Sequence, residues 1–400
     1  MTERSRCVQS TPRAILLLLG GFLFLGPTSL YCQRSALVDV ATIDRTRILS
    51  GAELYMKEIP QTVTAFSSPR SAGGIHEYFS EGDYWWPDPK NPEGPYIQRD
   101  GMSNPDNFNK HRELMQRFYR AVSTLAAAYK ITHDEKFVAQ AVRHLKAWFV
   151  DDSTKMFPHL KYAQAIKGKV TGRGTGIIDT IHLIEVARSV EILSGSPSMS
   201  NTDELAIKQW FTEYLTWLMT HQYGIDEREA KNNHGTWWVA QVATFAHTVG
   251  DTASLSFCRT RFKSVLLPNQ MAADGSFPGE LRRTKPYNYS LFNLEGMALT
   301  CQVLSTSGDN LWEFTLSDGR NMRKGMEFLY PYIVDKSKWP YPKDVMYFEY
   351  FPVRQSSLLF AAIALNEQKY VEAWKTLDPD PTNAEVQRNV PIRQPVLWVE

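Results

Sequence analysis

Apolar residues recur at helical spacing over most of the chain from about residue 110 onward. In one stretch they fall at positions 114, 118, 122 and 125, and in the next at 137, 141, 145 and 148. These intervals are close to the 3.6 residues of a helical turn, so each stretch is expected to bury one face of an amphipathic helix. A short polar turn separates the two stretches, and together they predict a helical hairpin.

The same alternation of helix and turn continues toward the C-terminus, and no strand pattern of comparable length occurs. Asp134, Asp203 and Asp251 stand at expected helix starts, where a carboxylate suits the N-terminal dipole. Hairpins in series cannot cover their own apolar faces and have to stack on one another. The sequence therefore predicts an all-α fold, an (α/α) toroid or incomplete barrel of stacked helical hairpins. The further expected helix pairs are 176–194 with 203–221, 236–249 with 252–266, 291–305 with 321–332, and 355–365 with 368–376.

Residues 1–35 differ in character from the rest of the chain. Arginines precede the apolar run of residues 14–25, which is too short to span a bilayer. This pattern is typical of an export signal. We therefore expect residues 36–400 to form a single domain that works in the periplasm or outside the cell, without an integral membrane domain. A lipoprotein anchor at Cys32 is a minor alternative, because bulky Tyr31 precedes it where a small residue is usual.

The overall charge is balanced, with 44 Lys and Arg against 43 Asp and Glu and a net charge of +1. Such a balance gives no global field that would favour nucleic acid or a membrane surface, so an anionic ligand would need a local basic cluster. Cys258 and Cys301 lie beyond the export signal. Export permits a disulfide between them, and two buried thiols are an equal alternative.

Residues 76–110 are rich in proline and aromatic residues and lack a helical period. This composition predicts an ordered loop that lines a site rather than a linker between domains. Trp85 and Trp86 are the candidates for stacking on a sugar ring, although aromatic residues beside proline often only pack.

Polar side chains gather at the entrances of two expected helices. The stretch EAKNNHGTWWVAQ, residues 229–241, places Asn232, Asn233 and His234 before an apolar helix. These residues could cap the helix, since asparagine favours that position. The stretch at 274–299 has basic residues and two tyrosines, again directly before an apolar helix: Arg282, Arg283, Lys285, Tyr287 and Tyr289. In a toroid both entrances can face one cleft.

An amide, a guanidinium, an imidazole and a phenol together suit an acidic sugar. Amide and guanidinium groups can neutralise a uronate carboxylate and so stabilise the enolate-like intermediate of β-elimination. A neutral histidine can then remove the C5 proton, and a tyrosine can protonate the leaving 4-oxygen. Whether the histidine or the tyrosine is the base depends on the relative orientation of proton and leaving oxygen, and both assignments stay open. The chemistry needs no metal or other cofactor.

The motifs NNHGTWW and DGSFPGELRRTKPYNYSLFNLEG resemble the paired signatures of the alginate-lyase-like polysaccharide lyases. YWWPDPKNPEGPYIQRDGMSNPD is similar to an N-terminal signature of one branch of that group. The resemblance implies a helical toroid enzyme that cleaves alginate or, in related branches, glucuronan.

By position, the resemblance assigns catalytic roles to Asn233, His234 and Tyr289. For the arginine that binds the substrate carboxylate, spacing from the preceding glutamate favours Arg283, while the distance to the tyrosine in alginate-cleaving members favours Arg282. Those members carry a histidine directly after the tyrosine, where this chain has Ser290. This difference makes a glucuronan-type substrate a serious alternative to alginate.

The candidate substrate-binding residues surround these positions or lie in glycine-rich and aromatic loops: Trp85, Trp86, Arg173, Asn232, Trp237 and Arg282. His182 falls in an apolar helix and is expected to be a core histidine. No spacing typical of a zinc or calcium site occurs, so no metal is expected. A chelator is therefore expected to leave the activity unchanged, and a loss of activity on chelation that is reversed by a divalent ion would contradict this expectation.

Two other functions remain compatible with the sequence. A glycoside hydrolase on the same fold would need a pair of carboxylates, for which several candidates exist: Asp83, Asp179, Glu280 and Glu349. A non-catalytic protein could instead bind an acidic polysaccharide through the same arginines and tryptophans.

Overall fold

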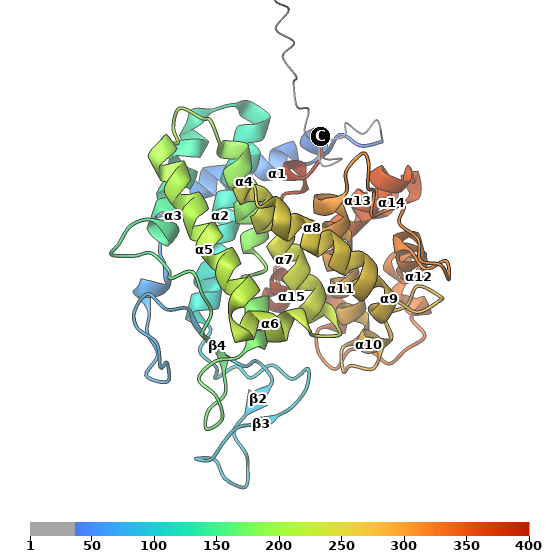
Figure 1. Ribbon diagram of the computed structural model, residues 1–400, viewed down its shortest axis with the longest axis horizontal. Coiled ribbons are helices and arrows are strands. Elements are labelled where there is room, and N and C mark those ends of the chain that lie inside the picture. Colours follow the sequence, from blue (N-terminus) through green and yellow to red (C-terminus); the bar gives the residue numbers. More distant parts are fainter. Residues whose placement is uncertain (1–36, 400) are drawn as a thin grey trace, which may run out of the picture.

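Helices make up most of residues 37–399, the part of the chain that the computed structural model describes (Figure 1). The expected export signal and Cys32 lie outside these residues. The α-helices are α1 (Val40–Tyr55), α2 (Lys110–Thr132), α3 (Glu135–Phe149), α4 (Leu183–Leu193), α5 (Asn201–Thr220), α6 (Gln222–Arg228), α7 (Asn233–Val249), α8 (Thr252–Arg261), α9 (Leu267–Gln270), α10 (Pro278–Leu281), α11 (Pro286–Leu304), α12 (Met322–Val334), α13 (Ser356–Leu365), α14 (Gln368–Thr376) and α15 (Ala384–Arg388).

The helices stack as hairpins around two central members, α7 and α11, which pack against each other. Helix α7 also contacts α4, α5 and α8, while α2 contacts α1, α3 and α4. Every residue of α11 is buried. A helix surrounded by others on all sides needs no polar face, which explains why its sequence is apolar with little periodicity. The predicted all-α toroid of stacked hairpins is confirmed.

The helix starts largely follow the sequence pattern. Asp134 and Asp251 are the N-caps of α3 and α8, and each side chain accepts a backbone hydrogen bond from the first turn. Asp203 lies in the first turn of α5, where Ser200 is the cap. The expected helix 176–194 is instead divided into a 3₁₀ segment, Gly174–Thr180, and α4. Helix α7 begins at Asn233, three residues before its expected start, so the candidate site residues belong to its first turn.

Four short strands lie in the long loops. β1 (Phe79–Glu81) pairs in parallel with β4 (Tyr162–Ala165), and β2 (Trp85–Trp86) pairs antiparallel with β3 (Ile97–Gln98). The β2–β3 hairpin projects from the helical body at the lower edge of Figure 1. The proline-rich segment 76–110 therefore forms this hairpin and its flanks rather than a helix.

The interior explains several residues that the sequence left ambiguous. Cys258 and Cys301 are free and buried, so they are two buried thiols and do not form a disulfide. His182 is 1% exposed and its ring stacks on Tyr119 with centroids 4.6 Å apart, which confirms a core histidine.

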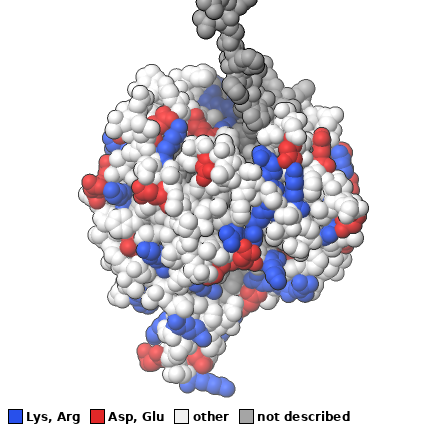
Figure 2. Space-filling model, viewed as in Figure 1, with Lys and Arg blue, Asp and Glu red and all other residues white. Residues whose placement is uncertain are grey.

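Acidic and basic side chains are interspersed over the face in Figure 2, in agreement with the balanced charge. Among the described residues, none of the helices combines the length and the apolar character that crossing a membrane requires.

The C-terminal segment runs back across the helices and is anchored by a buried carboxylate. Glu185 Oε1 of α4 accepts hydrogen bonds from the backbone N–H groups of Arg393 and Gln394, at 2.8 and 2.7 Å. Burial raises the pKa of Glu185 from 4.5 to about 7, although these hydrogen bonds oppose the shift. The folded protein therefore binds this proton more tightly than the unfolded chain does.

Glu185→Gln is expected to flatten the pH dependence of stability. In the wild type, the stabilisation that comes from the proton on Glu185 is complete below pH 4.5 and is lost as the pH rises through about 7. A glutamine does not titrate and keeps an acceptor for the two N–H groups. Urea unfolding over this range measures the effect, and an unchanged slope in the variant would contradict the assignment.

Candidate active site

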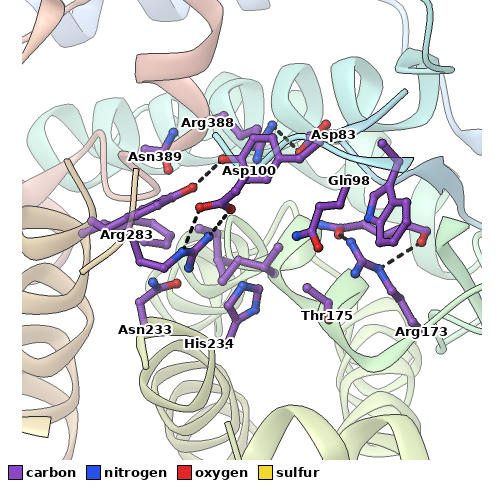
Figure 3. Close-up of a pocket in the computed structure, with 17 residues that line it drawn as sticks. Asp83, Gln98, Asp100, Arg173, Thr175, Asn233, His234, Arg283, Arg388 and Asn389 are labelled. Atoms are coloured by element: carbon purple, nitrogen blue, oxygen red, sulfur yellow. Dashed lines mark hydrogen bonds and ion pairs between the residues drawn. The ribbon is translucent and has the colours of Figure 1, made fainter. Parts of the chain in front are cut away.

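A single pocket collects side chains from helix entrances and loops that are far apart in the sequence (Figure 3). Asn233, His234, Arg283 and Tyr289 all line it. They come from the first turn of α7, the loop before α11 and the first turn of α11. The other lining residues are Asp83, Tyr84, Trp85, Gln98, Asp100, Gln164, Arg173, Thr175, Ile178, Ile181, Phe292, Arg388 and Asn389.

Asn233 is held rigidly at the start of α7. Its backbone N–H donates to Glu280 Oε1 at 2.6 Å, and its amide Nδ2 donates to Glu280 Oε2 at 2.8 Å. The carboxylate thereby satisfies a helix N-terminal N–H that has no intrahelical partner. Burial raises the pKa of Glu280, and the two hydrogen bonds from Asn233 oppose this. The second Nδ2 hydrogen of Asn233 remains available to a ligand. Asn232 is the N-cap of the helix and accepts from the His234 N–H.

The imidazole of His234 is oriented by a carboxylate from the preceding helix. Its Nδ1 lies 2.6 Å from Oε1 of Glu227, which is 3% exposed and belongs to α6. A carboxylate can only accept, so Nδ1 carries the proton. In the neutral ring Nε2 then keeps its lone pair, which is the arrangement a general base requires.

Glu227→Gln is expected to lower kcat by about 10²-fold, at the lower end of what general base catalysis contributes. The amide preserves the shape of the side chain but no longer fixes the tautomer, because its NH₂ group can donate to Nδ1. Steady-state kinetics measure the loss, and thermal unfolding serves as the control for folding. A variant with normal kcat would show that Glu227 only packs.

Arg283 is oriented by Asp100, which lies in the loop after β3. The guanidinium donates from Nη2 to Asp100 Oδ1 at 2.8 Å and from Nε to Oδ2 at 3.3 Å. Burial alone would lower the pKa of Arg283, but Asp100 and the nearby Tyr289 raise it, so the group stays charged. Figure 3 shows the guanidinium between Asp100 and Asn233. Its remaining N–H groups are available to a ligand.

Tyr289 is 7% exposed and forms a pair with a second phenol. Its Oη lies 2.6 Å from Tyr84 Oη, and the Arg283 guanidinium lies 4.5 Å from its ring centroid. Burial raises the pKa of Tyr289, while Arg283 and the hydrogen bond with Tyr84 oppose the shift. The raised pKa keeps this phenol protonated near neutral pH, so it can donate a proton.

Arg173 and Trp85 line the other side of the pocket. Arg173 Nη2 donates to Gln164 Oε1 at 2.7 Å, and its guanidinium lies 5.9 Å from the centroid of Trp85. Burial lowers the pKa of Arg173, and the carboxylates of Asp179, Asp83 and Glu227 oppose this only in part. An arginine held by a neutral amide beside an aromatic face can receive a second acidic group.

The other candidate substrate-binding residues do not line this pocket. Trp237 is 0% exposed and packs on Phe292 in the core, so its prediction as a substrate contact is wrong. Most of helix α7 is buried, so its sequence has no polar face from which the core position of Trp237 could be inferred. Arg282 and Trp86 do not line the pocket, and Asn232 lines an adjoining hollow together with Asp226 and Glu227.

Ser290 is fully buried and donates to the Pro286 carbonyl within its own helix. The position after the tyrosine thus faces the core rather than the pocket.

Several pocket residues were absent from the sequence-based hypothesis. Tyr84 and Asp100 lie in the proline-rich segment that was expected to line a site, but their residue types alone did not distinguish them. Arg388 and Asn389 lie at and beyond the end of α15, about 150 residues after the first recognised motif and about 90 after the second. No local signal marks them, because only the return of the C-terminal segment brings them to the pocket.

The carboxylates considered for a hydrolase are engaged elsewhere. Asp83 binds Arg112 and Arg388, at 2.6 and 2.7 Å, and Asp179 also binds Arg112. Glu280 holds Asn233, as described above. The Glu349 side chain is 74% exposed and does not line the pocket. Hydrolysis requires one protonated acid and one free carboxylate beside the bond, and these residues do not supply that pair.

Within residues 37–399, no group of three or more His, Cys, Asp or Glu side chains is arranged to hold a metal ion. The expectation of metal-free chemistry therefore remains a prediction, to be tested by chelation.

Comparison with known proteins identifies the family. The sequence profile of the alginate lyase family matches residues 62–339. The structure is similar to that of an alginate lyase from Bacteroides ovatus, with 31% sequence identity, a TM-score of 0.78, and coverage of 91% of this chain and 94% of that one. The chain belongs to the alginate lyase family. It is therefore a polysaccharide lyase, which excludes both the hydrolase and the non-catalytic alternative.

More distant structures agree on the fold of this lyase. Alginate lyase A1-III from Sphingomonas species A1 is 14% identical, with a TM-score of 0.53 and coverage of 91% of this chain and 95% of that one. A complex of a variant of the same enzyme with a tetrasaccharide is 16% identical, with a TM-score of 0.52 and coverage of 81% and 84%. No curated protein matches the chain in a sequence search.

Proposed function

We propose that this lyase cleaves a 1,4-linked polyuronate, alginate or glucuronan, by β-elimination and leaves unsaturated uronate ends. The observation that carries the proposal is the convergence of Asn233, His234, Arg283 and Tyr289 on one pocket. Each of them has a partner that fixes its orientation. Such preorganisation is what stabilises charge in a transition state without reorganisation during the reaction.

In the proposed mechanism, Asn233 and Arg283 bind the uronate carboxylate. Their N–H groups reduce its negative charge, so the adjacent C5–H bond becomes acidic enough to ionise. His234 Nε2 removes the C5 proton, because Glu227 keeps the Nδ1 proton in place. The electron pair forms the C4–C5 double bond as the bond from C4 to the 4-oxygen breaks, and Tyr289 Oη gives its proton to that oxygen. The acid role is assigned to Tyr289 because it lines the pocket beside His234 and, with burial raising its pKa, holds its proton near neutral pH.

We assign Trp85 and Arg173 to a neighbouring sugar of the polymer. The indole offers a flat apolar face, and Arg173 has hydrogen-bonding capacity beyond its contact with Gln164. An arginine beside an aromatic ring suits a negatively charged sugar, which supports an acidic polysaccharide as the substrate.

A panel of polyuronates tests this proposal. Purified protein is incubated with alginate, glucuronan and hyaluronan, and the ultraviolet absorbance of a conjugated uronate is followed, with the product mass as a second readout. Elimination conserves mass between substrate and products, whereas hydrolysis adds one water per bond. Absence of the absorbance on all polyuronates would contradict the proposed substrate class.

We also propose export to the periplasm or the medium, on the basis of the basic and apolar pattern in residues 1–35. Expression of the full chain followed by fractionation and N-terminal sequencing tests this. A cytoplasmic protein with the intact N-terminus would contradict it.

A further inference from the structure

A buried ammonium group stands behind the two phenols of the pocket. Lys285, the residue before α11, is 0% exposed, and its Nζ donates to Tyr84 Oη at 3.5 Å. The centroids of the Tyr84 and Tyr347 rings lie 5.2 and 4.9 Å from Nζ. Tyr84 Oη in turn lies 2.6 Å from Tyr289 Oη. Lysine, Tyr84 and Tyr289 thus form a continuous chain of polar atoms that ends in the pocket.

Lys285 is held in place by a carboxylate of the C-terminal segment. Glu385 Oε1 of α15 lies 3.3 Å from Nζ, and Glu385 Oε2 lies 3.2 Å from Nη1 of Arg388. Arg388 continues to Asp83 at 2.7 Å. Cations and anions alternate along this row, so each buried charge has an opposite neighbour, as buried charges require.

The ammonium group fixes the direction of the first hydrogen bond in this chain. A lysine has three donors and no acceptor, so Lys285 can only donate to the Tyr84 oxygen. The Tyr84 oxygen can accept from Lys285 while the Tyr84 hydroxyl donates to Tyr289 Oη. In this arrangement the proton of Tyr289 points toward a ligand in the pocket, whereas a Tyr289 hydroxyl that donated to Tyr84 would direct its proton away from the ligand.

We propose that Lys285, anchored by Glu385, is a positioning residue that favours Tyr289 as the proton donor of the elimination. The inference rests on the proposed role of Tyr289 and deepens it. When Tyr289 gives its proton to the leaving 4-oxygen, a phenolate forms on Tyr289. The Tyr84 hydroxyl and the ammonium behind it stabilise this charge. The proton that His234 has taken from C5 later restores the phenol through solvent, so protons balance over one turnover.

Other charged groups face the phenol pair from the surrounding elements. Arg283 lies over the Tyr289 ring and is neutralised by Asp100, while Glu385 and Arg388 approach from α15. Burial raises the pKa of Tyr84, Tyr289 and Glu385 raise it further, and Lys285 and Arg388 lower it. The carboxylates of Asp344 and Asp83 also interact electrostatically with Lys285. Lys285 and Glu385 therefore act on the ionisation of the pair in opposite directions.

Two substitutions separate these effects. In Lys285→Met the phenolate loses a nearby cation, so the ionisation of the pair is expected to begin at higher pH. In Glu385→Gln the cation is less compensated, so ionisation is expected to begin at lower pH. The readout is the near-ultraviolet phenolate absorbance during alkaline titration, taken as the difference between each protein and its Tyr289→Phe counterpart. This measurement needs no substrate.

Kinetics provide the second readout. General acid catalysis as a whole contributes about 10²- to 10⁴-fold, so losing the group that aligns the acid is expected to lower kcat about tenfold in Lys285→Met with little change in KM. Lys285→Arg, which keeps a cationic donor, is expected to recover part of the loss. Lys263 supplies the control. Its Nζ lies 2.5 Å from Asp309 Oδ1 and it does not line the pocket, so Lys263→Met is expected to leave kcat unchanged.

The outcomes are distinct. Titration shifts of opposite sign support the proposal, and shifts that are absent or of the same sign overturn it. If Lys285→Met fails to fold, Glu385→Gln alone decides by the direction of its shift. Opposite shifts in a protein inactive on all polyuronates would overturn the proposed substrate class and leave the effect of Lys285 on the phenol pair intact.

Discussion

Tyr289→Phe is expected to abolish nearly all turnover while substrate binding persists. The substitution removes only the hydroxyl, whose proton is proposed to go to the leaving oxygen. General acid catalysis typically contributes about 10²- to 10⁴-fold, so kcat is expected to fall by that factor. The ring and its contact with Arg283 remain, and the dissociation constant of the substrate should change little. Calorimetric binding to the inactive variant and the rate of absorbance increase measure the two quantities.

Tyr287 provides the matched control for this experiment. It lies on the same turn of α11, and its hydroxyl donates to the Tyr332 carbonyl at 2.9 Å, away from the pocket. Tyr287→Phe is expected to lower stability by about 1 kcal/mol through the lost hydrogen bond and to leave kcat unchanged. If Tyr289→Phe kept substantial turnover, the phenol would not be the acid, and the mechanism proposed above would be wrong.

Arg283→Ala is expected to lower kcat/KM by about 10²- to 10³-fold, which is the usual effect of removing one donor from a site that stabilises a developing anion. The loss has two physical causes. The uronate carboxylate loses a charged donor, and Asp100 is left without its partner beside the incoming negative charge. Steady-state kinetics on the best polyuronate of the panel measure the effect.

A second substitution distinguishes these two causes. In Arg283→Ala with Asp100→Asn, the repulsion by the orphaned carboxylate is removed, so part of kcat/KM should return. Arg282→Ala, at the neighbouring residue that does not line the pocket, is the control and should resemble the wild type. Equal losses in Arg282→Ala and Arg283→Ala would contradict the assignment of the carboxylate to Arg283.

The helical content and most helix positions were predictable, because amphipathic periodicity and capping are local properties. The carboxylates Asp134 and Asp251 cap the helices that follow them, as their places in the sequence indicated. Periodicity was less informative where a helix is buried on all sides. The fully buried α11 and the core position of Trp237 illustrate this, because an apolar sequence alone does not show which residue reaches a pocket.

The candidate catalytic residues were recognised from residue type and from the resemblance of two motifs, and all four of them line one pocket. Their partners were not recognised. Glu227 is seven residues before His234, but only the turn from α6 to α7 brings the two side chains to 2.6 Å. Asp100 meets Arg283 across more than 180 residues of sequence. Contacts at such separation leave no periodic trace in the chain.

The sequence by itself determined the stacked helical hairpins and the chemistry-bearing motifs at two helix entrances, because both depend on residues close together along the chain. The tertiary structure decided which arginine faces the pocket, which carboxylate orients His234, and how the C-terminal segment places Glu385 behind Lys285. The physical reason is that orientation and pKa depend on burial and on neighbouring charges, and these neighbours are brought together only when the distant segments pack.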